Sequence, residues 1–214
     1  PRGGPPPGGR LSRPAPSRTA PTRTDPNGTA MPIQRLNHAV LFVSDLERSL
    51  AFYRDVLGFR PLPQAFPGAA FLQAAGSAND HDLGLFRSPE PGSGPRTGRV
   101  GLYHLAWEVD TLSELARVRT RLAGAGALTG ASDHASTKAL YARDPDGIEF
   151  EVCWLVPDAA VAGELAAMTS PTRPLDIDAE IAVYGAETPG GPRTDHGVWR
   201  ELFAAGPGGV RDAR

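Results

Sequence analysis

The first clearly patterned stretch of the chain alternates as a β-strand does and then changes to a helical spacing. From Leu36 to Phe42 every second residue falls on one side of an extended chain, which predicts a strand ending near Val43. Ser44 and Glu47 fit the S-x-x-E capping box that begins many helices. The helical stripe that follows, and the glycine that ends it, are Leu46, Leu50, Tyr53, Leu57 and Gly58.

Proline and glycine interrupt the segment after this helix. The stretch from Pro61 to Gly68 is irregular, whereas Phe71 to Ala75 and His81 to Phe86 have the apolar character of strands. A strand, a helix and further strands in this order make one βαβββ module, which we expect to span residues 33–90.

The same order of elements then occurs a second time. A strand is predicted from Leu102 to Val109, and Thr111 to Glu114 forms a second capping box. Two more strands are predicted from Lys138 to Arg143 and from Ile148 to Trp154. The turn between them, Asp144 to Gly147, has proline at its second position. The helical stripe and its stop are Leu112, Leu115, Val118, Leu122 and Gly124.

The two repeats align without a gap at their starts. A valine and a leucine follow His38 at five and eight positions, and the same residue types follow His104 at the same intervals. Equivalent strand positions in two repeats are related by pseudo-symmetry, so we expect these two histidines to approach each other. The predicted fold class is therefore α+β, with two paired βαβββ modules at residues 33–90 and 100–156 and helices on the outside.

The two modules make up a domain that we place at residues 31–157. Residues 1–30 are rich in proline, glycine and arginine and hold one large apolar residue, so we expect a disordered leader, with Met31 as one candidate for the natural start. Residues 158–214 form a C-terminal helical extension and tail. Short helices are expected at 159–168 and 177–184, a helical turn at 198–204, and a frayed tail past Pro207.

Composition narrows the function classes. The chain has 214 residues and a formal net charge of -2, so no basic field favours nucleic acid or anionic lipid. A single cysteine, Cys153, excludes an intrachain disulfide. No apolar run approaches the roughly 20 residues of a membrane span. We expect a soluble cytoplasmic protein.

The residues with metal-ligand chemistry are His38, His104 and Glu151. Glu151 lies in the middle of a strand whose other face, from Phe150 to Trp154, is apolar, so its carboxylate points to the opposite side of the sheet. Two histidines and one carboxylate leave coordination positions open, an arrangement typical of non-haem Fe(II) oxygenases. No thiolate is among the three, which disfavours structural zinc. Glu149 on the same strand has the alternative role of a rim charge.

Other histidines have plainer interpretations. A strand histidine taken alone is most often a hydrogen-bonded or surface residue. His134 follows Asp133 in a loop-like stretch, where it is either an exposed residue of a turn capped by aspartate or a functional group. His196, beside Asp195 in the polar tail, is interpreted as a surface residue.

Four stretches of the chain resemble the vicinal oxygen chelate superfamily, which includes extradiol dioxygenases, glyoxalase I, and fosfomycin and bleomycin resistance proteins. They are LNHAVLFVSDLERSLAFYRDVLGF, HDLGLF, GLYHLAWEVDTL and LYARDPDGIEFEVCW. The resemblance covers about residues 33 to 156. It implies a curved, cup-like mixed sheet around a metal. The motifs are specific for the superfamily but much less specific for any one reaction within it.

Within the superfamily the residues match the extradiol pattern. The resemblance makes His38, His104 and Glu151 the iron ligands and His81 the acid–base residue near the metal. Tyr141 matches a tyrosine that binds the substrate oxygen, and His134 an active-site histidine beside the substrate. The activity implied is cleavage of a catechol-like aromatic diol by O2, with Fe(II), or Mn(II) as a second possibility. A homo-oligomer is an open expectation.

Three rival functions use the same fold. One is a metal-dependent isomerase or thiol transferase; glyoxalase I has a ligand glutamate near the strand that here offers His81. Another is a drug-binding resistance protein without chemistry, and a third is a protein with a structural metal. The chain also departs from many extradiol enzymes in having two modules rather than four, and in the Pro/Gly-rich insert from Ser88 to Gly98.

Overall fold

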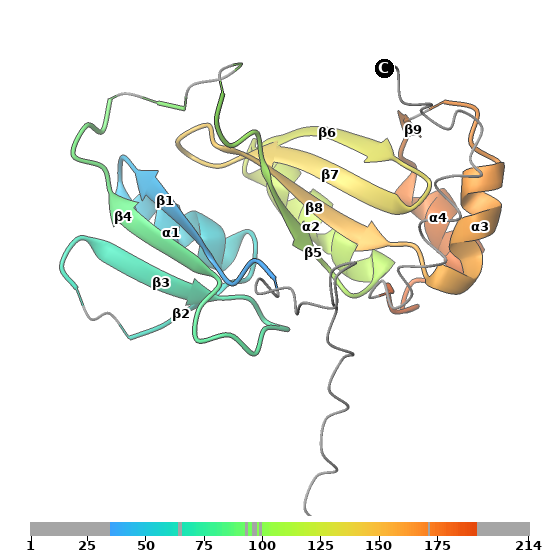
Figure 1. Cartoon of the computed structure of the whole chain (residues 1–214), viewed down its shortest axis with the longest axis horizontal. Coiled ribbons are helices and arrows are strands. Elements are labelled where there is room, and N and C mark those ends of the chain that lie inside the picture. Colours follow the sequence, from blue (N-terminus) through green and yellow to red (C-terminus); the bar gives the residue numbers. More distant parts are fainter. Residues whose placement is uncertain are drawn as a thin grey trace, which may run out of the picture. The chain divides into compact units, whose positions relative to one another are not determined.

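A strand, a helix and three more strands occur twice in this computed structural model, which describes residues 35–63, 66–92, 94–95, 98, 100–170 and 172–191 (Figure 1). The expected leader at 1–30, Met31, His196, the helical turn at 198–204 and the tail past Pro207 lie outside the described residues. Asn37 begins the compact unit that holds every element described below. No helix in the described ranges has the length and apolarity needed to cross a membrane.

The first module contains the elements β1 (Ala39–Val43), α1 (Leu46–Asp55), β2 (Arg60–Pro61), β3 (Ala69–Gln73) and β4 (Leu83–Arg87). Its four strands form one sheet in the order β1-β4-β3-β2, in which β1 runs parallel to β4 and the other neighbours are antiparallel. The parallel pair at the edge follows from the helical connection that returns the chain across the sheet.

The second module contains β5 (Leu105–Glu108), α2 (Leu112–Gly124), β6 (Leu128–Asp133), β7 (Thr137–Arg143) and β8 (Glu149–Leu155). Its sheet has the order β5-β8-β7-β6-β9, with β5 parallel to β8. The extension supplies α3 (Asp158–Ala166), β9 (Arg173–Pro174) and α4 (Ile177–Tyr184). The predicted α+β class, the two modules and the two short C-terminal helices are confirmed.

Each sheet packs one face against its own helix, as Figure 1 shows. In the first module the buried residues of that face include Leu41, Leu72 and Leu85. In the second module Phe150, Val152 and Trp154 pack with the apolar stripe of α2, as the alternation of β8 predicts. We call the face of each sheet that does not pack on its module's helix the inner face. On β8 that face carries Glu151, because alternate residues point to opposite sides.

The helix starts confirm one predicted capping box and contradict the other. Thr111 and Glu114 form the reciprocal pair of hydrogen bonds expected at the start of α2. At α1 the N-cap is Asp45, which accepts from the backbone N–H of Arg48, and the prediction for Ser44 was wrong. The Ser44 hydroxyl donates instead to Asp146, a partner from the other module that local sequence does not reveal.

The end of α2 also differs from the prediction. Gly124 is the last helical residue rather than the stop, and Gly126 takes the left-handed conformation, with φ of 66°. β6 was not predicted as a strand. Its pairing with β7 shifts register between Leu128 and Gly130, which interrupts the alternation that a sequence pattern relies on.

The turn between β7 and β8 in the second module forms hydrogen bonds with the first module. Asp146 accepts hydrogen bonds from the backbone N–H of Ser44 at 2.9 Å and from the Arg48 guanidinium at 2.8 Å. The buried Tyr53 hydroxyl of α1 donates to Asp144 at 3.1 Å. Burial, followed by the charge of Asp144, raises the pKa of Tyr53, so this hydroxyl remains a donor at neutral pH.

A buried ionic cluster holds the C-terminal extension to the second sheet. Lys138 on β7 is fully buried, and its ammonium lies 2.8 Å from Asp133, 3.2 Å from Glu164 and 3.2 Å from Glu180. Arg173 adds a second cation, 2.6 Å from Asp133 and 3.2 Å from Glu164. Burial alone would lower the pKa of Lys138, but these carboxylates outweigh it and raise that pKa.

Replacing Lys138 with methionine should destabilise the fold strongly, because it leaves buried carboxylates short of a cation. We expect the free energy of unfolding at neutral pH to fall by about 3–5 kcal/mol in a urea titration. The deficit should shrink as the pH falls below about 5, where protonation of the carboxylates removes the unpaired charge. The same change at Arg143, an exposed ion-paired residue of the same strand, should cost less than about 1 kcal/mol. Equal losses in the two variants would contradict the buried network.

Candidate metal and substrate site

Glu151 lies at the centre of a polar cluster on the inner face of the second sheet. It pairs across strands with Tyr141 on β7, and the chain enters β5 directly after His104. The imidazole Nε2 of His104 is 3.3 Å from Glu151 Oε2, although the two residues are far apart in sequence. Both side chains are largely buried, with 27% and 13% exposure. A nitrogen and an oxygen donor of the predicted ligand set therefore lie within contact distance.

Tyr141 extends this cluster toward His134. The Tyr141 hydroxyl and His134 Nε2 are 2.8 Å apart, and the His104 and Tyr141 rings are 6.1 Å apart between centroids. Burial, followed by the charge of Glu151, raises the pKa of Tyr141, so the phenol stays protonated at neutral pH. His104, Glu151, Tyr141 and His134, four of the six predicted site residues, thus belong to one connected group.

His134 combines both interpretations that its sequence context allowed. The Asp133 carboxylate accepts from the backbone N–H of Ala135 at 2.8 Å, as in an aspartate-capped turn, and Ala135 has φ of 62°. The imidazole of His134 is half-buried and directed to Tyr141 rather than exposed. The turn therefore presents the histidine to the inner face.

The other two predicted residues lie together on the first module. The rings of His38 and His81 are 4.4 Å apart between centroids. His38 is exposed and its Nδ1 is 2.7 Å from the Asn37 side-chain oxygen. His81 has a side-chain exposure of 19% and its Nδ1 is 3.1 Å from Asp80. His38 and His81 thus form a second pair of imidazoles, which lies on the side of the first sheet that α1 does not cover.

The structure brings the predicted residues together as two groups and not as one. In the described ranges, no three His, Cys, Asp or Glu side chains lie close enough to hold a metal ion. His38 therefore does not join His104 and Glu151 in this arrangement. Glu149, which had the alternative role of a rim charge, pairs with Arg143 at 2.6 Å on the same strand ladder.

A comparison with protein families accounts for these paired modules. Residues 35–152, more than half of the chain, match the family described as the Glyoxalase/Bleomycin resistance protein/Dioxygenase superfamily. The chain belongs to this superfamily. The resemblance inferred from the sequence motifs is confirmed. The matched residues include all six predicted site residues: His38, His81, His104, His134, Tyr141 and Glu151.

Members of the superfamily with different activities are similar to this chain. Catechol-2,3-dioxygenase of Bacillus subtilis (strain 168) is 34% identical over 119 residues, 55% of this chain and 40% of that protein. A lactoylglutathione lyase of Neisseria meningitidis serogroup A is 31% identical over 121 residues, 55% of this chain and 88% of that protein. The chain therefore spans less than half the length of the Bacillus protein.

A solved structure of a superfamily domain is also similar. The glyoxylase/bleomycin resistance protein/dioxygenase domain from Frankia sp. EAN1pec is 26% identical, with a TM-score of 0.49, and the match covers 56% of this chain and 97% of that chain.

Tyr103, which no sequence pattern singled out, contacts His104 of the candidate site. Its ring lies 4.7 Å from that of His104, and the residue is 74% exposed. A strand beginning at Leu102 would place Tyr103 and His104 on opposite faces. In the superfamily fold of this chain, β5 begins only at Leu105, so the irregular backbone before it allows both rings to lie together.

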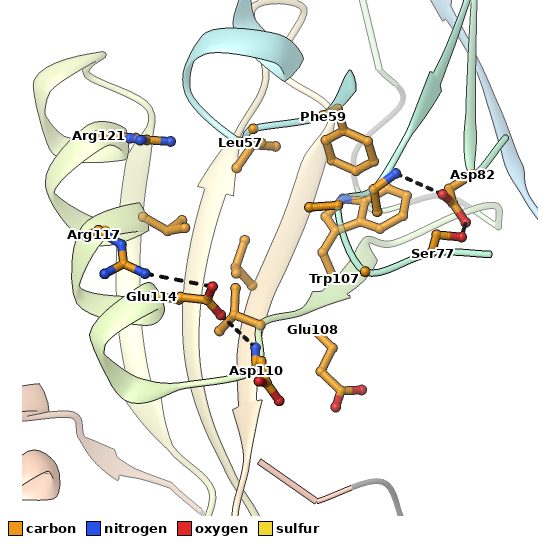
Figure 2. Close-up of a pocket in the computed structure, with 17 residues that line it drawn as sticks. Leu57, Phe59, Ser77, Asp82, Trp107, Glu108, Asp110, Glu114, Arg117 and Arg121 are labelled. Atoms are coloured by element: carbon orange, nitrogen blue, oxygen red, sulfur yellow. Dashed lines mark hydrogen bonds and ion pairs between the residues drawn. The ribbon is translucent and has the colours of Figure 1, made fainter. Parts of the chain in front are cut away.

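A separate cavity of about 830 Å³ lies away from the predicted residues (Figure 2). Its apolar lining includes Leu57, Phe59 and Trp107, and Figure 2 shows Arg117 and Arg121 of α2 along one wall. None of the six predicted site residues lines it. The cavity therefore belongs to the helix-covered side of the fold, not to the inner faces that carry the histidines.

Proposed function

We propose that this chain is a metal-dependent extradiol-type dioxygenase that cleaves a catechol-like aromatic diol with O2. The observation that carries the proposal is the connected group of His104, Glu151, Tyr141 and His134 on one sheet face. It combines metal donors with hydrogen-bonding groups suited to a diol. The similarity to a Catechol-2,3-dioxygenase supports the same activity. Iron(II) is the metal we propose, with Mn(II) as the alternative.

The residues fit such a metal by their donor chemistry. His104 Nε2 and Glu151 Oε2 lie 3.3 Å apart and would supply a nitrogen and an oxygen ligand, and His38 would supply the third ligand of the proposed set. When bound, the metal would increase the acidity of a diol as it does that of water, and would hold diol and dioxygen side by side. The ligand set contains one carboxylate, so it suits a divalent ion with open positions.

The remaining residues would position the substrate and move its protons. Tyr141 keeps its proton at neutral pH and can donate a hydrogen bond to a substrate oxygen. His134, in contact with the Tyr141 hydroxyl, orients that phenol. His81 would accept a proton from one diol hydroxyl and later return one to the departing oxygen, because an imidazole nitrogen can both accept and donate a proton.

A second candidate is a metal-dependent glyoxalase or thiol-transferase reaction on the same ligands. It is favoured by the similarity to a lactoylglutathione lyase, which this chain matches over 88% of that protein's length. The histidine at position 81, with no glutamate in its strand, is the feature that favours the dioxygenase. Drug sequestration without chemistry is a further alternative.

Replacing Glu151 with alanine should weaken metal binding, because it removes the only carboxylate of the proposed set. We expect the affinity for Fe(II), measured anaerobically by competition with a chelator, to fall by at least about 100-fold. Glu149→Ala is the matched control, since it removes a carboxylate from the same face of the same strand and should leave the affinity within about threefold. Stoichiometric, tight Fe(II) in Glu151→Ala would remove Glu151 from the ligand set.

The origin of the third ligand can be determined by mixing variants. His38→Ala and Glu151→Ala should each bind metal weakly. If one chain contains the whole site, a refolded mixture of the two variants recovers no tight metal binding. If His38 acts across two copies, the mixture recovers about a quarter to a half of the wild-type metal sites, and the protein sediments as a dimer.

Oxygen uptake by the Fe(II)-loaded protein tests the reaction. We expect uptake with a catechol panel, together with absorbance of a yellow ring-opened product. His81→Ala should lower kcat by about 10²–10⁴-fold while metal binding is retained, because a proton carrier is lost. Tight metal binding with no uptake for any diol, together with substrate-dependent loss of thiol, would instead establish the transferase or isomerase alternative.

A further inference from the structure

The cavity on the helix-covered side has the size and the lining of a ligand-binding pocket (Figure 2). Its volume of about 830 Å³ falls within the range of about 300–1,000 Å³ that is usual for small-molecule sites. Both modules contribute to its apolar walls, with Leu57 and Phe59 after α1 and Trp107 on β5. Val118 of α2 and Val152 of β8 add buried aliphatic surface. Such walls suit the body of an apolar ligand.

An aromatic pair forms part of this lining. The Phe59 and Trp107 rings are 5.1 Å apart between centroids and meet edge to face, at an angle of 79°. Phe59 is only 6% exposed, whereas Trp107 is partly exposed. The buried ring therefore holds the indole in place and leaves part of the indole surface available to an occupant. Rings of this kind attract other aromatic rings by stacked or edge contacts.

Two arginines of α2 supply positive charge to the cavity. Arg117 and Arg121 are one helical turn apart, so they lie on the same face of α2, which forms one wall in Figure 2. Arg117 is 3.7 Å from Glu114, and both side chains are exposed, so this ion pair is weak.

Arg121 is the cation that is available to a ligand. In the part of the chain that the structure describes, it forms no hydrogen bond or ion pair. Its Nη1 lies 3.9 Å from the position of a β-carbon placed on Gly58, another lining residue, so the guanidinium reaches from α2 to the first module. A guanidinium can bind a carboxylate through two parallel hydrogen bonds. An unpaired arginine beside an apolar pocket therefore favours a ligand with a carboxylate.

The carboxylates of the lining limit the charge of the occupant. Asp82 is bonded within its own turn, and Glu114 accepts from backbone N–H groups at the start of α2. Glu108 and Asp110 add two more negative charges, and Figure 2 shows them at the end of the cavity away from Arg121. A ligand with several negative charges would meet repulsion there. The distribution favours one negative charge, placed near Arg121.

We propose that this cavity binds a monoanionic aryl carboxylate, with the carboxylate on Arg121 and the rings against Leu57 and the pair of Phe59 and Trp107. A molecule with two linked or fused rings would use more of the volume than a single ring. The site is separate from the candidate metal site, because none of the six predicted site residues lines the cavity. The inference therefore does not depend on the proposed function.

Calorimetric titration of the full chain with three probes tests the ligand class. The probes are biphenyl-4-carboxylate, the neutral biphenyl-4-carboxamide, and benzoate, in a buffer with EDTA so that no metal holds the carboxylate. The charged biphenyl should bind at least about tenfold more tightly than the carboxamide, because it adds a charge-assisted hydrogen bond. It should also bind at least about tenfold more tightly than benzoate, because the second ring buries more apolar surface. Equal Kd values for the two biphenyls would overturn the proposal.

A charge-removing variant tests the role of Arg121. Arg121→Gln should raise the Kd of biphenyl-4-carboxylate at least about fivefold and leave that of the carboxamide within about twofold, because only the ionic contact is lost. Arg119→Gln is the matched control. It removes an exposed arginine of the same helix that does not line the cavity, and it should change neither value. An undiminished preference for the carboxylate in Arg121→Gln would refute the site.

Three further measurements locate the ligand. Leu57→Ala should weaken the binding of both biphenyls by the same factor of about threefold or more, because it removes apolar wall without removing charge. The indole N–H signal of Trp107, assigned in an NMR spectrum by its loss in Trp107→Phe, should shift on addition of biphenyl-4-carboxylate. Glu151→Ala should bind this probe with the wild-type Kd. An unmoved Trp107 signal, or a Kd that Glu151→Ala raises, would place the ligand elsewhere and overturn the proposal.

Discussion

The contact between the β7–β8 turn and α1 is the constraint on which the rest of the structure depends. Two carboxylates in one short turn bind the first helix of the other module: Asp146 holds its N-terminal end through Ser44 and Arg48, and Asp144 meets the buried Tyr53 hydroxyl. Asp144 is only 5% exposed, and this burial raises the pKa of its carboxyl group. Because β8 follows the turn directly, Glu151 is tied to the same connection.

Much of the fold follows from local patterns in the sequence. The alternation in β8 places Phe150 and Trp154 in the core and Glu151 on the other face, and Thr111 begins α2 as its capping box predicts. The failures involve partners distant in sequence. Asp45 rather than Ser44 caps α1, and the Ser44 hydroxyl donates to Asp146 of the other module. Lys138 lies buried within a strand because α3, β9 and α4 bring it carboxylates and a neighbouring arginine. No local pattern contains that information.

The candidate site shows the same division. The sequence identified residue types suited to a metal and a diol, and the structure places His104 against Glu151 and His134 against Tyr141. Tyr103 was missed because its contact depends on where β5 begins. The separation of His38 from His104 also lay beyond the pattern, since repeat symmetry indicates equivalent positions and not the distance between them. The predicted site residues thus form two groups, one on each sheet.

The ionic cluster around Lys138 links the C-terminal extension to the turn that carries His134. The Asp133 carboxylate pairs with Lys138 and Arg173. It also accepts from the backbone N–H of Ala135, which holds the turn that directs His134 toward Tyr141. The residues that match the superfamily end at position 152, whereas Glu164, Arg173 and Glu180 all lie beyond it. The set of residues that position His134 against Tyr141 therefore extends beyond the family match, because Asp133, which holds the turn at His134, is itself bound by Arg173 of the extension.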